Sequence, residues 1–179
     1  DKQKQEKILT NVLENDEIPA ITTPYFNFFE LDVLCQMGKL TEVLDKIRSY
    51  WGGMLDLGAV TFWEEYDPSV PKEEQYDMYG DHFGKSLCHA WAASPIYFLA
   101  KYFAGLDLVN KDGVTYVLKP QMQYFIDLDC TLPVGSHGTV RLIWDGEYLD
   151  VTPDADGGVL ELGEEKISLV RGETRRVKI

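Results

Sequence analysis

Two adjacent carboxylates, Glu64 and Glu65, follow two aromatic side chains in the run LGAVTFWEEYD, residues 57–67. Carboxyl groups serve as general acids and bases, and glycoside hydrolysis usually uses two of them, about 5–9.5 Å apart across the scissile bond. Neighbouring residues point in different directions in any regular element, so these two cannot face each other as such a pair. One of them could supply one member of a pair, or both could form a solvated acidic rim beside an aromatic core.

Aromatic residues are dense around the two glutamates and are mixed with acidic residues and histidines. Sugar rings stack their apolar faces on aromatic rings and need polar partners for their hydroxyls, so this mixture suits a small-molecule pocket. The same rings could equally fill a core and keep their polar tips in water. The residues concerned are Trp63, Tyr66, Tyr76, Tyr79, Phe83 and Trp91.

His89 could orient a carboxylate or donate to a substrate hydroxyl. A lone histidine is more often a satisfied core or surface residue, so both interpretations stay open. His82 precedes it across a predicted join between loop and helix, which fixes no geometry for a metal. The three cysteines are widely spaced and contain no C-x-x-C pair, which argues against a zinc site. We therefore expect neither a metal nor a cofactor.

Helical periodicity dominates the chain up to about residue 105. Pro24 fits the first turn of a helix that ends at Gly38. Apolar residues at three- and four-residue spacing predict another helix over 40–51, interrupted by Gly52 and Gly53. Short connections between consecutive helices favour antiparallel helical hairpins.

Residues 57–85 contain prolines, glycines and a polar run, and they predict a long, largely irregular loop. Loops of this length inside compact domains are more often functional than accidental. Helix is predicted to return at SLCHAWAASPIYFLAKYFAGL, with Ser86 as its N-cap and Pro95 as the point where it kinks or splits.

Beyond about residue 105, short β-branched or aromatic runs are separated by Gly, Pro and Asp. About six strands at this spacing predict a small antiparallel β-sandwich, and Asp145–Gly146 marks a hairpin within it. The expected fold class is therefore α+β, with helical hairpins over residues 1–106 and a β-sandwich over residues 107–179.

The charge balance of the 179-residue chain argues against two classes of partner. Seventeen basic and thirty acidic side chains give a formal net charge of −13. Such a chain repels phosphate backbones and anionic lipid, so nucleic acid and membrane surfaces are poor candidates. The sequence also contains no run of about 18 apolar residues that would predict a membrane span.

Three separate motifs follow one another in the helical half of the chain. Residues 58–64 contain Gly-Ala-x-Thr-x-Trp-Glu, residues 86–91 contain Ser-x-x-His-Ala-Trp, and Ser94–Pro95 follows. Together they resemble α-L-rhamnosidases of glycoside hydrolase family 78. These motifs are similar to the end of the family's catalytic domain, and TLPVGSHGTVRLIW resembles its C-terminal β-sandwich. The resemblance implies that the helical hairpins belong to an (α/α)6 toroid and that a β-sandwich follows it.

The resemblance also implies a reaction that inverts the anomeric carbon of L-rhamnose. A general acid protonates the leaving oxygen, and a general base activates water on the opposite face. The family's base falls on Glu64, and its active-site histidine falls on His89, while Trp63 and Trp91 shape the pocket. The predicted substrate-binding residues are His89, Trp63, Trp91, Glu65 and Tyr79.

The family's general acid lies far upstream of these motifs, so residues 1–179 would contain only the last helices of the toroid. We expect the chain alone to be inactive and its full-length parent to release terminal α-L-rhamnose from glycosides or polysaccharides. Uncovered helix faces would then associate with the rest of the catalytic domain or with a second copy. The alternative is a non-catalytic carbohydrate-binding or structural remnant of the same fold. An unrelated helical interaction module would require the motif match to be accidental.

Overall fold

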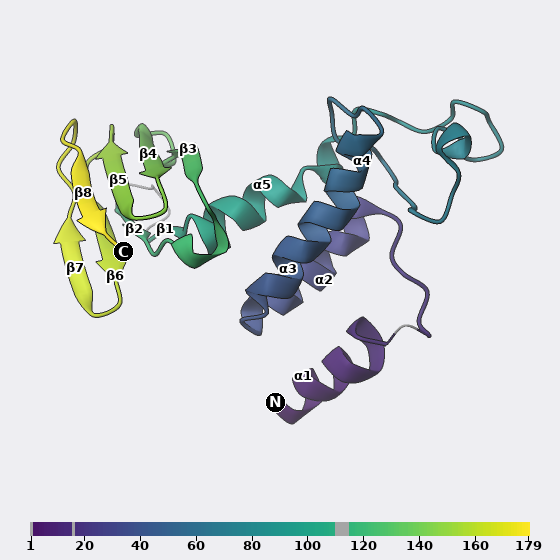
Figure 1. Cartoon of the computed structure of the whole chain (residues 1–179), viewed down its shortest axis with the longest axis horizontal. Helices are drawn as coiled ribbons and strands as arrows, with labels where there is room; N and C mark the ends of the chain where they lie inside the picture. Colours follow the sequence, from purple (N-terminus) through teal and green to yellow (C-terminus); the bar gives the residue numbers. More distant parts are fainter. Residues whose placement is uncertain (1, 16, 110–114) are drawn as a thin grey trace. The chain divides into compact units, whose positions relative to one another are not determined.

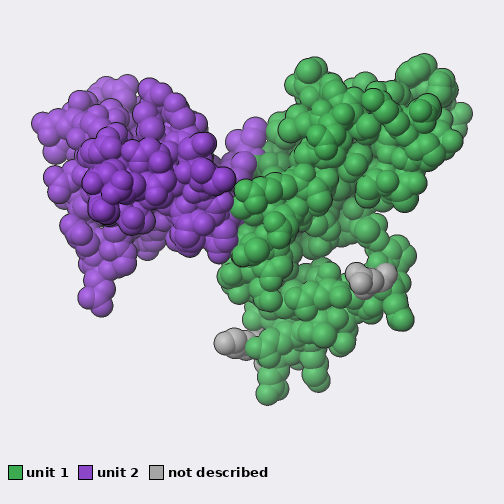
Figure 2. Space-filling model, viewed as in Figure 1, with its two compact units in different colours: residues 1–95 green, residues 96–179 purple. Residues whose placement is uncertain are grey.

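The computed structural model describes residues 2–15, 17–109 and 115–179. The chain divides into two compact units, residues 1–95 and 96–179, which Figure 2 shows in different colours. The first unit contains helices and a long loop, and the second contains a helix and two β-sheets. The predicted α+β class is therefore confirmed, while the domain boundary after residue 106 stays a prediction. In the described parts of the chain, no helix has the length and apolar character to cross a membrane.

The first unit begins with three helical stretches. α2 starts at Pro24, as predicted, because the missing N–H of proline is not needed in a first helical turn. It ends before Gly38, whose φ of +75° is the left-handed conformation that closes many helices. α2 and α3 lie side by side (Figure 1). The elements are α1 (Lys2–Ile8) with the π-helical turn η1 (Leu9–Leu13), α2 (Pro24–Gln36), α3 (Leu40–Lys46), the π-helical turn η2 (Ile47–Trp51) and α4 (Gly52–Asp56).

The predicted interruption at Gly52 and Gly53 was wrong. Both glycines lie within α4, which runs to Asp56. Gly53 instead permits a close approach, because a Cβ atom there would lie 2.4 Å from the hydroxyl oxygen of Tyr66. Glycine at position 53 therefore leaves room for the Tyr66 ring and does not interrupt the helix.

The loop from Leu57 to Lys85 is largely irregular, as predicted (Figure 1). Its ordered pieces are a 3₁₀ turn, η3 (Lys72–Glu74), and an isolated bridge between Met78 and Asp81. Gln75 is buried inside the loop, where its Nε2 donates to the carbonyl oxygens of Asp67 at 2.6 Å and Val70 at 2.8 Å. The loop thus has a polar interior of its own that holds its shape.

The predicted helix start at Ser86 was also wrong. Residues 86–89 contain no helix, and a single 3₁₀ turn, η4 (Ala90–Ala92), follows them. The helix proper is α5 (Ser94–Phe98), continued by the π-helical turn η5 (Leu99–Phe103). Pro95 is the second residue of α5, which is separate from η4, so of the two predicted outcomes at Pro95 the split is confirmed and the kink is not.

In the second unit, the described strands form two four-stranded sheets, in the orders β1-β2-β6-β7 and β3-β4-β5-β8. The predicted sandwich was wholly antiparallel, but β2 and β6 run parallel. The whole run from β3 to β5 lies between them in the chain, and such a long connection permits parallel pairing. The strands are β1 (Leu106–Leu108), β2 (Tyr116–Leu118), β3 (Leu128–Pro133), β4 (Thr139–Trp144), β5 (Tyr148–Pro153), β6 (Gly158–Leu162), β7 (Glu165–Ser168) and β8 (Arg175–Lys178).

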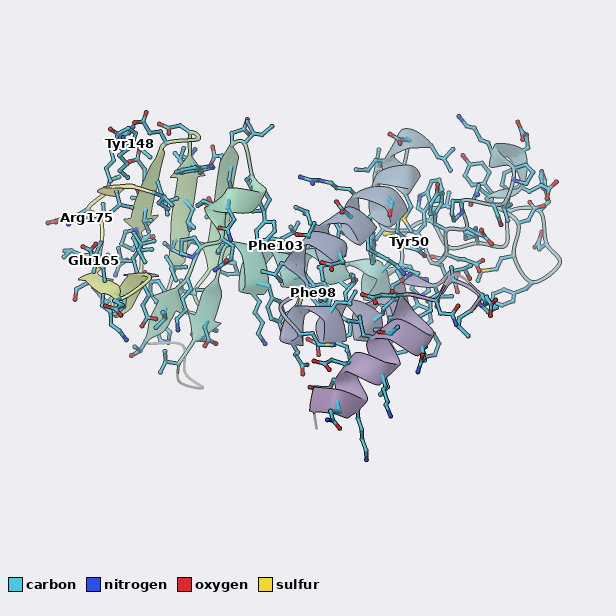
Figure 3. All side chains as sticks on the ribbon, turned by 60° about the horizontal axis from the view of Figure 1, so that its bottom comes forward. Tyr50, Phe98, Phe103, Tyr148, Glu165 and Arg175 are labelled. Atoms are coloured by element: carbon cyan, nitrogen blue, oxygen red, sulfur yellow. The ribbon has the colours of Figure 1, made fainter. Side chains whose placement is uncertain are left out.

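The first and last of these strands were not predicted. β8 consists mostly of charged residues, as is usual for an edge strand that must not pair with another molecule. It pairs with β5, and Arg176 donates to Asp150 at 2.9 Å across that pair. Arg175 at the start of β8 and Tyr148 at the start of β5 are labelled in Figure 3.

The core of the second unit lies between the two sheets. Side chains alternate along β4, where Val140, Leu142 and Trp144 are buried and their neighbours are exposed. They share one apolar cluster with Tyr116 of β2. The buried ring of Phe103 (Figure 3) extends this packing from η5, with edge contacts to Tyr124 and Phe125 at 5.5 and 5.8 Å.

Candidate active site

Two irregular segments of the first unit are joined by hydrogen bonds and build the site. The N–H of Glu64 donates to the carbonyl oxygen of Ser86 at 2.9 Å, and the N–H of His89 donates to that of Phe62 at 2.8 Å. The hydroxyl of Thr61 donates to the carbonyl oxygen of Leu87. These bonds connect residues 61–64 with residues 86–89 across the loop. They bring the two central predicted residues, Glu64 and His89, to one place.

The Glu64 carboxylate is buried and held at both oxygens. Its Oε2 accepts the backbone N–H of Ser86 at 3.1 Å, and its Oε1 accepts the hydroxyl of Tyr79 at 3.4 Å. The Nδ1 atom of His89 lies 3.8 Å from Oε2. The side chains of Glu64 and His89 keep exposed fractions of 12% and 28%, so water can reach a carboxylate whose orientation is fixed.

Tyr79 reaches Glu64 from the tip of a tight turn. Met78 and Asp81 exchange backbone hydrogen bonds of 3.0 and 2.9 Å, and the two residues between them have φ values of +56° at Tyr79 and +81° at Gly80. Tyr79 is 85% exposed, and it holds a backbone conformation that a bulky residue rarely adopts. The negative charge of Glu64 raises the pKa of the Tyr79 phenol, so the phenol keeps the proton that it donates.

Glu65 contacts a different set of residues, as the adjacency of the two glutamates predicted. Its Oε1 accepts the hydroxyl of Thr22 at 2.9 Å, and its Oε2 lies 3.9 Å from Nζ of Lys85. Lys85 is buried, and burial lowers the pKa of its ammonium against the opposing effect of Glu65. Sequence reasoning did not find Lys85, because no local pattern shows that a lysine in a polar loop is buried.

The two predicted tryptophans occupy different environments. Trp63 is 3% exposed and packs edge-on against Tyr76, so its buried ring anchors the segment that carries Glu64. Trp91 is 48% exposed, and its ring centre lies 4.3 Å from that of His89 at an interplanar angle of 34°. The ring centre of Trp91 also lies 5.2 Å from that of Tyr25 of α2. Tyr25 was not predicted, although the aromatic-rich start of α2 was a signal for it.

The row of rings from Tyr25 through Trp91 to His89 ends at the Glu64 carboxylate. An exposed aromatic face beside an anchored carboxylate and an imidazole can stack on an apolar ligand face, accept a proton and contact a hydroxyl. In this arrangement Glu64 is the carboxylate that water can reach. Glu65 does not form an acid–base pair with it, since its carboxylate contacts Thr22 and Lys85.

Comparison with known proteins identifies the fold as that of a part of a glycoside hydrolase. A GH78 family rhamnosidase of Bacillus sp. GL1 matches with a TM-score of 0.68 and 23% identity, over 89% of this chain and 17% of that chain. A rhamnosidase from Klebsiella oxytoca with rhamnose bound matches with a TM-score of 0.49 and 35% identity, over 57% of this chain and 19% of that chain. No protein-family model and no curated protein matches the sequence.

The predicted resemblance to family 78 rhamnosidases is thus confirmed as a likeness of fold. This chain spans less than a fifth of the length of either rhamnosidase, 17% and 19% respectively.

Proposed function

We propose that this chain is the C-terminal segment of an inverting α-L-rhamnosidase-like glycoside hydrolase of family 78. In this proposal its helices complete an (α/α)6 toroid, and the parent protein releases terminal α-L-rhamnose from glycosides or polysaccharides. The observation that carries the proposal is the buried Glu64 carboxylate, held by the Ser86 N–H and the Tyr79 hydroxyl beside His89. The likeness of fold to the Bacillus rhamnosidase supports it.

In the proposed reaction, Glu64 is the general base. Its carboxylate takes a proton from water while the water oxygen bonds to the anomeric carbon, and the glycosidic bond breaks on the opposite face. The leaving oxygen receives a proton from a general acid on another part of the parent protein. The Ser86 N–H and the Tyr79 hydroxyl orient Glu64, and each carboxylate oxygen keeps a second lone pair that can accept the proton of the water.

Of the remaining predicted residues, His89, Trp91 and Tyr79 contact the sugar in this proposal, and Glu65 and Trp63 have a supporting role. His89 lies between the base and the half-exposed ring of Trp91, where its imidazole can contact a sugar hydroxyl while the exposed part of the Trp91 ring packs against the apolar face of the sugar. Tyr79 contacts the other carboxylate oxygen, Oε1 of Glu64. Glu65, through its bond to Thr22, and the buried ring of Trp63 hold the segment that carries the base.

The experiment that tests the proposal compares the full-length parent with its Glu64→Gln variant on an aryl α-L-rhamnoside. Glutamine keeps the size of the side chain but cannot accept the proton, so kcat should fall by about 10²–10⁴-fold. Glu73→Gln, an exposed acid in η3, is the control and should keep the rate of the wild type. NMR of the first product should show the β-anomer, as inversion requires. An unchanged kcat in Glu64→Gln would refute the role of Glu64.

A second candidate function is carbohydrate binding without hydrolysis, which the half-exposed ring of Trp91 beside His89 favours. Here an L-rhamnoside would raise the melting temperature of residues 1–179, and Trp91→Ala would abolish the shift. An inactive parent with such a shift would support this alternative, and no shift at high millimolar sugar would count against it.

A further inference from the structure

Lys85 is a buried lysine of the first unit. Its side chain is 4% exposed, although it lies at the end of a long irregular loop. Lysine is almost never buried to this extent unless an acidic group compensates for the lost hydration. The compensating group is Glu65, whose Oε2 lies 3.9 Å from Nζ. This pair connects the last residue of the loop to the residue that follows Glu64.

Acidic groups surround the ammonium from several segments. The charges of Glu65, Asp67, Asp77 and Glu64 all favour the protonated form of Lys85, while burial opposes it and has the larger effect on its pKa. Burial of Lys85 therefore carries a desolvation penalty that the neighbouring acidic groups offset only in part. A group kept under such conditions is a candidate for a functional role and not only for packing.

Lys85 directly precedes Ser86, the residue whose backbone binds Glu64. The N–H of Lys85 donates to the carbonyl oxygen of Tyr76 at 3.1 Å, which fixes this end of the loop. The next residue, Ser86, binds the backbone N–H of Glu64 through its carbonyl and the carboxylate of Glu64 through its N–H. A displacement of Lys85 therefore passes through one peptide unit to the donor that orients the carboxylate.

We propose that Lys85 is a positioning residue for the base, paired with Glu65 so that the Ser86 N–H meets the Glu64 carboxylate. This inference rests on the proposed function of Glu64. The pair has two effects. It fixes the segment that carries the Ser86 donor, and its positive charge offsets the repulsion between the adjacent carboxylates of Glu64 and Glu65.

The test uses the full-length parent and an aryl α-L-rhamnoside. Lys85→Met keeps the length and apolar stem of the side chain but removes its charge. We expect kcat to fall by about tenfold to 100-fold with a small change in KM, because a displaced catalytic group impairs the reaction more than binding. The acidic limb of the pH profile should move to higher pH, because the two carboxylates lose a neighbouring positive charge.

Lys85→Arg keeps the charge and should recover most of kcat and the position of the acidic limb. The matched control is Lys72→Met, at an exposed lysine in η3 of the same loop, and it should behave as the wild type. If Lys85→Arg and Lys85→Met were equally impaired, the charge would not be the cause and the proposal would be overturned.

Glu65→Gln tests the same pair if Lys85→Met does not fold. Glutamine keeps the volume and removes the partner charge, so the acidic limb should move to lower pH, opposite to the shift in Lys85→Met. Glu74→Gln in η3 is its control. A folded Lys85→Met or Glu65→Gln variant with an unmoved limb and unchanged kcat would overturn the inference.

The two proposals fail in different ways. If Glu64→Gln keeps full activity, the proposed base is wrong whatever Lys85 does. If Glu64→Gln is inactive while the Lys85 and Glu65 variants match the wild type, only the positioning role is wrong.

Discussion

Ser86 is bonded to Glu64 twice, since its carbonyl accepts the Glu64 N–H at 2.9 Å and its own N–H donates to the Glu64 carboxylate at 3.1 Å. The side chain of Glu64 therefore turns back onto the segment that its backbone already binds. At Oε2 the orientation of the carboxylate depends on a main-chain N–H, which every residue except proline can supply at position 86.

Substitution of Ser86 separates the backbone from the side chain. Ser86→Ala keeps both hydrogen bonds, so its kcat in the parent should stay within a few-fold of the wild type. Ser86→Pro removes the donor to Glu64 Oε2, which should lower kcat by at least tenfold and stability by about 1–3 kcal/mol. Steady-state kinetics and urea unfolding measure the two quantities. A large loss in Ser86→Ala would show that the hydroxyl, and not the main chain, matters.

Substitution of Tyr79 should raise the stability of the chain and lower the activity of the parent. Its left-handed backbone at φ +56° is unfavourable for tyrosine, and its ring is 85% exposed. Asparagine adopts this conformation more readily, so Tyr79→Asn should raise the free energy of unfolding by up to about 1 kcal/mol. The same change removes the hydroxyl that contacts Glu64 and should lower kcat several-fold. Tyr124→Phe in η6 (Met122–Tyr124) controls for loss of a phenol elsewhere. Lower stability in Tyr79→Asn would contradict the assignment of strain.

Local signals in the sequence predicted the elements whose ends are determined locally. Proline in a first helical turn and glycine in a left-handed cap bounded α2 correctly, since both depend on the φ angle of one residue. The Asp145–Gly146 pair likewise marked the turn between β4 and β5. The likeness of fold to a rhamnosidase was also predicted, from motifs within residues 58–95 and 131–144 and not from periodicity.

Non-local contacts explain where prediction from the sequence failed. Residues 86–89 have apolar spacing typical of a helix, but their backbone groups bind Phe62 and Glu64 across the loop, and these bonds replace helical ones. The candidate site was predicted by its residue types, while its geometry depends on this pairing. Lys85 was missed for the same reason, because its burial comes from residues that only the fold brings around it.

The adjacent glycines of α4 should respond oppositely to alanine. A Cβ at Gly52 meets no atom within 4 Å, so Gly52→Ala should stabilise the chain by about 0.5–1 kcal/mol through the better helix propensity of alanine. A Cβ at Gly53 would lie 2.4 Å from the Tyr66 hydroxyl, and the Tyr66 ring is held 5.5 Å from that of Tyr50. Gly53→Ala should therefore destabilise by about 1–3 kcal/mol. Urea unfolding of both variants checks this, and equal effects would show that Tyr66 moves aside freely.

Asp145 should stabilise the β4–β5 turn in a pH-dependent way. Its Oδ1 accepts the N–H groups of Tyr148 at 2.7 Å and Glu147 at 2.9 Å, and these bonds hold the pKa of Asp145 below its usual value. The lower pKa in the folded state means that the unfolded state takes up the proton first as pH falls. The stabilisation is therefore fully present above the unfolded pKa of about 3.9 and is lost as pH falls through the folded pKa.

Asp145→Ala should accordingly lower Tm at pH 7, and the difference from the wild type should shrink as pH falls below about 4. Thermal unfolding of residues 1–179 at several pH values measures this difference. Asp127→Ala, at an exposed aspartate of the same unit, is the control and should leave Tm nearly unchanged throughout. Moderate salt should reduce the Asp145 effect only in part, since backbone donors contribute more to it than the nearby Arg176. A difference that stays constant down to pH 3 would mean that the ionised carboxylate is not what stabilises the turn.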